Sequence, residues 1–171
     1  VGRLTRNKDH QTLLEAFRLM NDTVPSRLLI VGEGPERASL EKIIAETGLA
    51  DRVQLPGFVD TPWAWMAKSS LFVLSSFAEG SGNVLTEAMA VGTPVVSTDC
   101  PLGPSEMLDG GRIAPLVPVG DAKALAVACI DVLDSGIAAS LLDEAVAPFK
   151  AEVAAKHYLA FMNVGVPSST Y

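Results

Sequence analysis

Two carboxylates, Glu79 and Glu87, lie eight positions apart in a stretch of small residues and are well placed to do chemistry. Gly80 and Gly82 follow the first carboxylate, so the backbone there can turn sharply and stay open to a ligand. A negatively charged carboxylate repels an anion, so the natural partners of both carboxylates are the hydroxyl groups of a neutral ligand. A sugar on one side and a ribose on the other would fit this pair.

The elements that must position these carboxylates are a strand before them and a helix around the second one. The short apolar run 71–74 is typical of a strand buried on both faces of a parallel sheet, although periodicity alone does not exclude a helix. The loop 78–83 follows it, and Ser81 or Asn83 is predicted to cap a helix over 84–91.

A second strand follows this helix and completes the unit. Residues 92–94, Gly-Thr-Pro, end the helix, and residues 95–98 are again short and apolar. The sequence therefore predicts a strand, glycine loop, helix and strand. Such a unit leaves free backbone N–H groups at the helix start, over the carboxyl end of the sheet, which suits an anion such as a diphosphate.

These residues also carry a family resemblance. The segment 77–96 resembles the E-x7-E signature of the retaining GT-B glycosyltransferases, group 1 (family GT4), because spacing, flanking glycines and the Gly-Thr-Pro-Val-Val strand all coincide. Other parts agree in order, and they are residues 1–4 with 8–10, residues 28–37, residues 52–58 and Gly120-Asp121. The resemblance spans nearly the whole chain and covers the C-terminal, donor-binding half of a two-domain fold.

The resemblance implies a role for several basic and polar groups. Arg3 and Lys8, which without it would be ordinary surface charges, resemble the diphosphate-binding pair of the family and would join Glu79 as catalytic residues. Their guanidinium fork and ammonium would neutralise a leaving diphosphate, so that no metal is needed. The implied nucleotide-sugar-binding residues are Glu87, Gly80, Ser81, Gly82, Asn83, Val84, Gly32, Gly57 and Phe58.

Two other segments, the loop after 27–31 and the short helix at 61–68, allow more than one interpretation. The loop after the strand 27–31 resembles a dinucleotide motif, but Arg37 occupies the position of the third glycine and no acidic residue ends a following strand at the right distance. A tight strand-to-helix turn and a border of the nucleotide site both remain open for Glu33 and Arg37. In the short helix expected at 61–68, we favour packing over a sugar platform for Trp63, Trp65 and Met66.

The composition of the chain limits the kinds of partner that it can bind. The chain has 171 residues and a net charge of −7, with a pI near 4.7, which argues against a nucleic-acid or anionic-membrane surface. The two cysteines, Cys100 and Cys129, fit a reduced cytoplasmic setting, and no apolar run reaches transmembrane length. His10 and His157 stand far apart without a ligand cluster, so we expect no metal and no cofactor.

We therefore predict an α/β fold, a single doubly wound, Rossmann-like parallel sheet of about six strands with helices on both faces. The expected strands are 1–4, 27–31, 52–55, 71–74, 95–98 and 112–117. The expected helices cover 9–20, a segment after the loop 32–37, 61–68, 84–91, a start near Ser105, 122–133 after an Asp121 N-cap, and 141–162. The resemblance implies that residues 1–163 form the donor domain with a terminal helix that crosses back, that residues 164–171 form a tail, and that the N-terminal acceptor domain is absent.

The function implied is donor binding in a cytoplasmic hexosyltransferase-type enzyme, whose membrane contact, if any, would come from the absent domain. The donor would be a nucleotide diphosphate sugar, UDP-linked in preference to GDP-linked, and the fragment alone would be inactive. A non-catalytic nucleotide-sugar or phosphate-binding module is one alternative, although the complete set of Arg3, Lys8, Glu79 and Glu87 counts against it. A related GT-B epimerase or phosphorylase is another, but a phosphorylase would need a lysine-held cofactor for which the sequence gives no reason.

Overall fold

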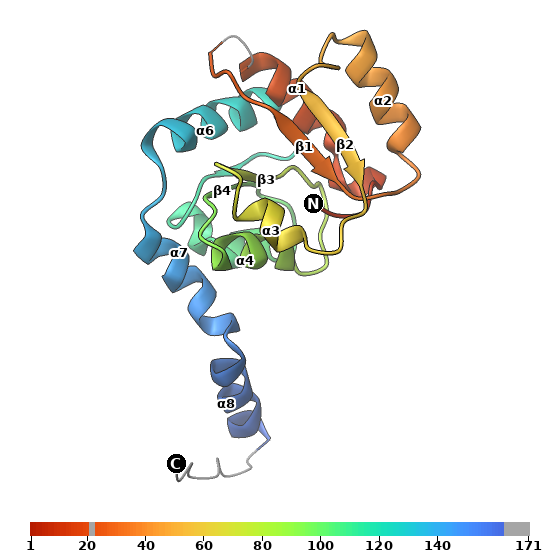
Figure 1. Cartoon of the computed structure of the whole chain (residues 1–171). Helices are drawn as coiled ribbons and strands as arrows, with labels where there is room; N and C mark the ends of the chain where they lie inside the picture. The colour runs from red at the N-terminus through yellow and green to blue at the C-terminus, as the bar shows by residue number, and fades with distance from the viewer. Residues whose placement is uncertain (21–22, 163–171) are drawn as a thin grey trace.

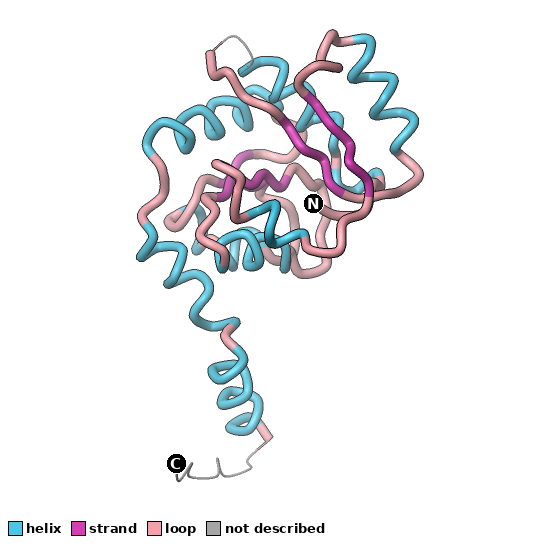
Figure 2. Tube along the Cα trace, viewed as in Figure 1, coloured by secondary structure: helices cyan, strands magenta, loops and turns pink. Residues whose placement is uncertain are grey.

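The strands of this protein form two short parallel sheets. The structure, a computed structural model, describes residues 1–20 and 23–162, so the expected tail at 164–171 lies outside the described residues. The described strands are β1 (Leu28–Val31), β2 (Val53–Gly57), β3 (Phe72–Leu74), β4 (Val95–Thr98) and β5 (Leu116–Val117). One sheet pairs β1 with β2, and the other has the order β3-β4-β5 (Figures 1 and 2).

Helices cover both sides of the strands (Figure 1). The α-helices are α1 (His10–Met20), α2 (Arg37–Glu46), α3 (Pro62–Met66), α4 (Asn83–Ala90), α5 (Pro104–Met107), α6 (Ala122–Ser135), α7 (Ala139–Val146) and α8 (Ala151–Phe161). The 3-10 turns are η1 (Arg6–Lys8), η2 (Asp109–Gly111) and η3 (Ala147–Phe149). The predicted strand, glycine loop, helix and strand unit is present as β3, α4 and β4.

Alternation along β4 places apolar side chains in two separate cores. Val96 belongs to a cluster with residues of α1, α2 and α6, whereas Val95 belongs to a cluster with residues of α4, α5 and α7. Successive side chains of a strand point to opposite faces, so a strand buried on both faces reads as a continuous apolar run. This arrangement confirms the predicted α/β class with helices on both faces.

The single sheet of about six strands is not what the described residues form. Residues 1–4, expected as a strand, run beside the end of β1 through two backbone bonds, from Gly2 N to the Val31 oxygen (2.9 Å) and from Leu4 N to the Glu33 oxygen (2.8 Å). These bonds reach the last residue of β1 and the loop after it, and residues 1–4 do not form a strand that would join the two sheets into one. The last strand is also shorter than 112–117: residues 112–114 form a turn and bends after η2, and β5 begins only at Leu116.

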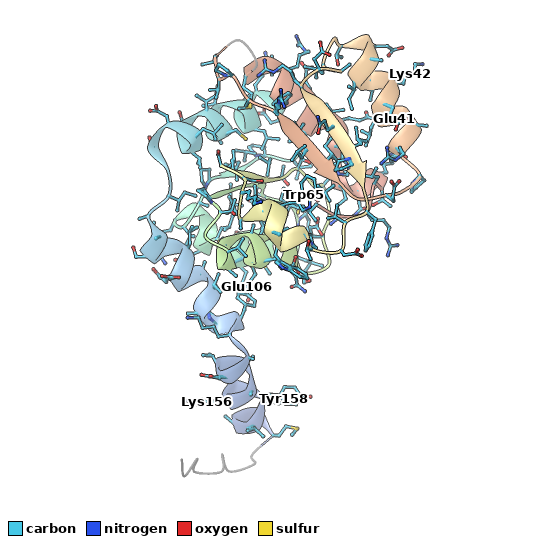
Figure 3. All side chains as sticks on the ribbon, viewed as in Figure 1. Glu41, Lys42, Trp65, Glu106, Lys156 and Tyr158 are labelled. Carbon is cyan, nitrogen blue, oxygen red and sulfur yellow. The ribbon has the colours of Figure 1, made fainter. Side chains whose placement is uncertain are left out.

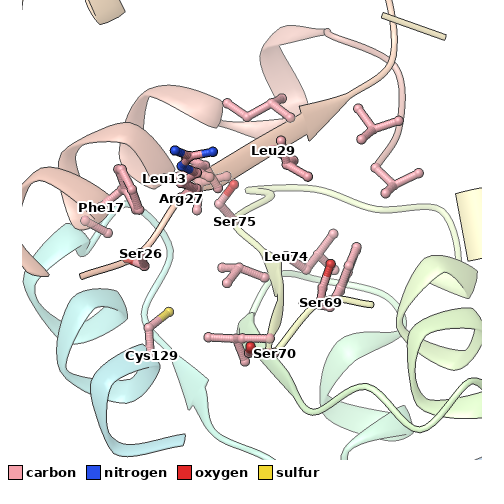
Figure 4. A pocket seen from close by; sticks show the side chains of 18 of the residues that line it. Leu13, Phe17, Ser26, Arg27, Leu29, Ser69, Ser70, Leu74, Ser75 and Cys129 are labelled. Atoms are coloured by element: carbon pink, nitrogen blue, oxygen red, sulfur yellow. The ribbon is translucent and has the colours of Figure 1, made fainter. Parts of the chain in front are cut away.

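A cavity of about 690 Å³ lies between the two sheets. All of β1 and all of β3 line it, and Lys8, Ser75 and Ser76 line it together with them. Figure 4 shows Leu29 on one side of this space and Leu74 and Ser75 on the other. Among the described strands, β1 pairs with β2 alone and β3 with β4 alone, and both β1 and β3 line the cavity.

Several local predictions can be compared with the structure. Asp121 caps α6 as expected, accepting a hydrogen bond from the amide of Ala124 at 2.9 Å. Neither Ser81 nor Asn83 caps α4, because Gly82 takes that position with a φ of 67°. On α3, Met66 is buried, but Trp63 and Trp65 are exposed at 55% and 38%, so packing in the core was the wrong prediction for the two indoles.

The C-terminal helices α7 and α8 lead away from the sheets (Figures 1 and 3). Tyr158 and Phe161 on α8 are exposed, and none of the α8 side chains that the structure describes belongs to either apolar core. Within residues 1–20 and 23–162, a helix with the length and apolar character to cross a membrane occurs only as a bent pair, 122–135 with 139–156, kinked by 117°.

Candidate functional site

An ion pair joins two of the predicted catalytic residues. Lys8 Nζ donates to both carboxylate oxygens of Glu79, at 2.7 Å to Oε1 and 2.9 Å to Oε2. The side chains are 20% and 8% exposed, so the pair is largely shielded from water. Lys8 ends η1 and Glu79 lies in the loop after β3, so the pair links two segments 71 positions apart in the chain.

Buried hydroxyls and one amide hold these two segments together. The Ser76 hydroxyl donates to Glu79 Oε1, and the Ser75 hydroxyl donates to the main-chain oxygen of Lys8 at 2.9 Å. Asn7 adds two further hydrogen bonds between the segments. Its side-chain amide donates to the main-chain oxygen of Ala78 at 3.2 Å, and its main-chain oxygen accepts from the backbone N–H of Phe77 at 3.0 Å. These hydrogen bonds tie the loop carrying Glu79 to the segment of η1.

The start of α4 provides backbone donors next to this loop. Gly82 turns the chain into the helix in the left-handed region, and Leu85 N donates to its oxygen at 2.8 Å. The first amides of a helix have no partner within it, so the N–H groups of Asn83 and Val84 are available to an anion. Gly103 packs against this turn so closely that a Cβ there would lie 2.4 Å from the Ser81 oxygen.

The predicted residues of the other sheet lie together at its carboxyl end. Gly32 N donates to the Gly57 oxygen at 2.8 Å, and a Cβ on Gly32 would lie 1.8 Å from the Gly2 oxygen. Glycine at position 32 is thus required for the close approach of residues 1–4 to β1. Phe58, the next residue after β2, projects into solvent with 76% of its surface exposed.

Arg37 has a structural partner in this part of the molecule. Its guanidinium forms ion pairs with Glu33 and Glu41, each at 2.8 Å, and donates to the Leu55 oxygen at 3.1 Å. Its hydrogen bonds hold the pKa of Glu33 below the ordinary value. Of the two alternatives left open for Glu33 and Arg37, these contacts support the strand-to-helix turn.

Two predicted residues do not join the Lys8–Glu79 pair. Arg3 is exposed and, among the described residues, makes no ion pair. Glu87 lies on the second turn of α4, exposed, where it lines a separate hollow of about 350 Å³ with Phe149 and Lys150. The two carboxylates therefore have different surroundings, Glu79 in an ion pair with Lys8 and Glu87 beside a separate hollow.

Burial shifts the pKa of His10 and of both cysteines. Burial lowers the pKa of His10 to about 4, with Lys8 among the cationic neighbours that act in the same direction. Burial, and then the charge of Glu79, raises the pKa of the Cys100 thiol, and burial raises that of Cys129 to about 12. Both cysteines are free and buried, and the described residues contain no cluster of metal-ligating side chains.

Sequence reasoning missed Ser75, Ser76, Asn7 and Thr98, which shape the loop from below. Thr98, at the end of β4, donates from its hydroxyl to the Ser76 oxygen at 2.5 Å. The available signal was position: polar residues directly after buried strands lie at the carboxyl edge of the sheet, where open α/β folds bind ligands.

Solved structures share this fold. TarM of S. aureus superposes with a TM-score of 0.84 at 24% identity over 95% of this chain and 34% of its own, and that crystal contains UDP. Anabaena HepE, solved in complex with UDP, gives a TM-score of 0.79 at 25% identity over 95% of this chain and 47% of its own. Both likenesses support the Rossmann-like half of a GT-B fold.

Curated relatives agree in sequence. A Campylobacter jejuni N-acetylgalactosaminyltransferase acting on an undecaprenol-diphosphate-linked sugar is 36% identical over 73% of this chain, and the Rhizobium meliloti lipopolysaccharide core glycosyltransferase LpsE is 36% identical over 74%. The chain spans about a third of their lengths, 34% and 36%. The family model described as glycosyl transferases group 1 matches residues 1–135, so this chain belongs to the group 1 glycosyltransferases.

Proposed function

We propose that this chain is the donor-binding half of a retaining glycosyltransferase that uses a nucleotide diphosphate sugar, with UDP-sugars preferred over GDP-sugars. One observation carries the proposal: a largely buried Lys8–Glu79 pair lies beside the free amides at the start of α4. Cationic and N–H donors for a diphosphate thus adjoin a carboxylate acceptor for sugar hydroxyls.

Each charged group has a part in this proposed reaction. When the bond between the anomeric carbon and the diphosphate oxygen breaks, its electron pair stays on the diphosphate. Lys8, Arg3 and the α4 amides would stabilise that charge, which makes a metal unnecessary. The acceptor oxygen bonds to the anomeric carbon on the face the diphosphate leaves, and the acceptor proton goes to the leaving diphosphate.

Glu79 and Glu87 would hold the two neutral parts of the donor. Glu79 would accept hydrogen bonds from hydroxyls of the sugar, and Glu87 from those of the ribose, in keeping with their separate places on the structure. The turns at Gly32 and at Gly57–Phe58 would border the nucleotide. UDP is favoured because TarM and HepE were each solved with UDP.

The acceptor would be bound by an N-terminal domain of the same protein, because the chain spans only about a third of its curated relatives. A cleft shared by two domains excludes water and completes the contacts around the donor. We therefore expect this chain to bind donor but transfer no sugar alone, and we propose a cytoplasmic location for the whole enzyme. Measurable transfer by the purified 171-residue chain would refute the two-domain proposal.

Calorimetry of the purified chain tests donor binding. We expect weak binding of UDP, with dissociation constants in the high micromolar to millimolar range that half a cleft allows, and weaker binding of GDP. Addition of a chelator should leave both titrations unchanged. Failure to bind either nucleotide, or strict dependence on magnesium, would contradict the proposal. Inorganic diphosphate serves as the control for simple anion binding.

A further inference from the structure

The hydroxyl of Ser76 is buried beneath the Glu79 carboxylate. Ser76 has no exposed surface, and its Oγ donates to Glu79 Oε1, the same oxygen that accepts from Lys8 at 2.7 Å. Hydrogen bonds to a charged acceptor are stronger than neutral ones, particularly where water is excluded. This bond therefore restrains the carboxylate from within the protein.

The two oxygens of Glu79 are not equivalent. Within the described residues, Oε1 accepts from both Lys8 and Ser76, whereas Oε2 accepts from Lys8 alone. An ionised carboxylate has about four acceptor positions, two on each oxygen. Oε2 therefore keeps acceptor capacity, and it would gain more once Lys8 turns to a bound diphosphate, while Ser76 still holds Oε1.

Ser76 is itself fixed to the sheet. Its main-chain oxygen accepts from the Thr98 hydroxyl at 2.5 Å, and Thr98 is fully buried at the end of β4. A chain of contacts thus runs from β4 through Ser76 to the carboxylate. Neither side chain has exposed surface, so we expect any effect of these hydroxyls on the donor to act through Glu79.

We propose that Ser76 is a positioning residue, supported by Thr98, that orients Glu79 so that Oε2 accepts the hydrogen bond from the donor sugar. This inference rests on the proposed function. It predicts that the Ser76 hydroxyl affects recognition of the sugar and leaves recognition of the nucleotide alone.

The test measures the affinities of the 171-residue chain for UDP and for a UDP-hexose, and takes their ratio as the sugar-dependent gain. Ser76→Ala should bind UDP within about twofold of the unmodified chain and lose most of the gain, up to about tenfold. Ser97→Ala is the matched control, because it removes another fully buried serine hydroxyl, one that donates to the Thr98 oxygen at 2.9 Å.

A second pair of variants tests the support from β4. Thr98→Val should reduce the gain in part, whereas Thr93→Val, which removes a buried hydroxyl bonded to the Met66 oxygen at 2.7 Å, should leave it unchanged. If Ser76→Ala does not fold, Ser76→Cys replaces it, since a thiol is a weaker donor of similar size and should give an intermediate gain.

The possible failures differ. A folded Ser76→Ala chain that keeps the full gain overturns this inference and leaves the proposed function intact. An equal loss for UDP and UDP-hexose also overturns it, because that pattern indicates a general disturbance of the loop. An unmodified chain that binds neither ligand overturns the proposed function and this inference with it.

Discussion

The ammonium of Lys8 and the carboxylate of Glu79 form an ion pair. Substitution of either residue therefore leaves the charge of the other without this partner. Removing Glu79 frees a partly buried cation beside the proposed diphosphate position. Removing Lys8 leaves a carboxylate that is 8% exposed with Ser76 as its remaining donor among the described residues. The two variants are therefore expected to differ in stability as well as in binding, with Lys8→Ala the more damaging.

The two carboxylates should separate in a binding experiment. Glu79→Ala should leave UDP affinity intact or slightly higher, because Lys8 is released, and should remove the sugar-dependent gain. Glu87→Ala should weaken UDP and UDP-sugar alike by about tenfold, because a hydrogen bond to a charged group is worth about 1.5–3 kcal/mol and this site is open to water. Titration calorimetry with both ligands measures this.

Thermal melts of the same variants provide the control. If Glu87 serves only the helix dipole, its loss should lower stability by about 0.3–1 kcal/mol with binding unchanged. Equal losses of UDP affinity from the two substitutions would contradict the division between sugar and ribose.

His10 should make the fold sensitive to mild acid. Burial lowers its folded-state pKa from 6.5 to about 4, so between these values the unfolded chain binds a proton that the folded chain does not. The stability contribution is present above pH 6.5 and is lost as the pH falls toward 4. A loss of roughly 2 kcal/mol between pH 7.5 and pH 4.5 is expected from about 1.4 kcal/mol per pKa unit.

Urea unfolding of the chain and of His10→Gln at several pH values isolates this contribution from that of the carboxylates. The difference in unfolding free energy between the two should shrink as the pH falls. Parallel curves for the two chains would show that His10 titrates normally in the folded state.

At the scale of elements, the turn into α4 depends on two glycines from different loops. Gly82 supplies the left-handed residue that starts the helix, and Gly103 lets the loop before α5 approach the Ser81 oxygen. A side chain at position 103 would therefore push on the segment that presents the α4 amides. The element order sets this contact, since the loop after β4 and the loop after β3 lie side by side at the carboxyl edge.

Gly103→Ala should accordingly destabilise the chain and weaken UDP binding together. Its φ of 109° is already unfavourable for alanine, and the Cβ would meet the Ser81 oxygen at 2.4 Å. Gly110→Ala is the control, because Gly110 has a φ of 60° and open space around its Cβ position, so only the left-handed cost of about 1 kcal/mol applies. Denaturation midpoints and UDP titrations compare the two, and equal effects would exclude a role for the contact.

The sequence predicts elements better than it predicts their contacts. The unit around Glu79 was predicted as 71–74, 84–91 and 95–98, and the structure has Phe72–Leu74, Asn83–Ala90 and Val95–Thr98, because apolar runs and glycine breaks are local signals. The capping by Gly82 and the exposed indoles of α3 were missed. The Ser76–Glu79 bond was also missed, because it depends on the exact turn of the loop. The roles assigned to the site residues remain predictions.

At the scale of the whole molecule, the two halves of the predicted sheet hold together through their carboxyl ends and through helix packing. Residues 2–4 bind to the end of β1, and residues 7–8 bind to the segment after β3. Helix α1 packs against α6, which in turn packs against β4. These contacts surround the space between β1 and β3, which remains as the cavity described above.

That cavity bears on how the isolated chain should behave at high concentration. Strands β1 and β3 both line the cavity, and within the described residues each pairs with one other strand only. A strand edge without a partner strand is a template for an extended chain that can supply hydrogen bonds. Self-association should therefore rise with concentration, because an extended segment of one molecule can pair with a strand edge of another. Sedimentation velocity across a dilution series measures this, and a monomer at every concentration would show that the edges are inaccessible. The concentration at which this chain stays monomeric would then depend on its unpaired strand edges rather than on its acidic surface.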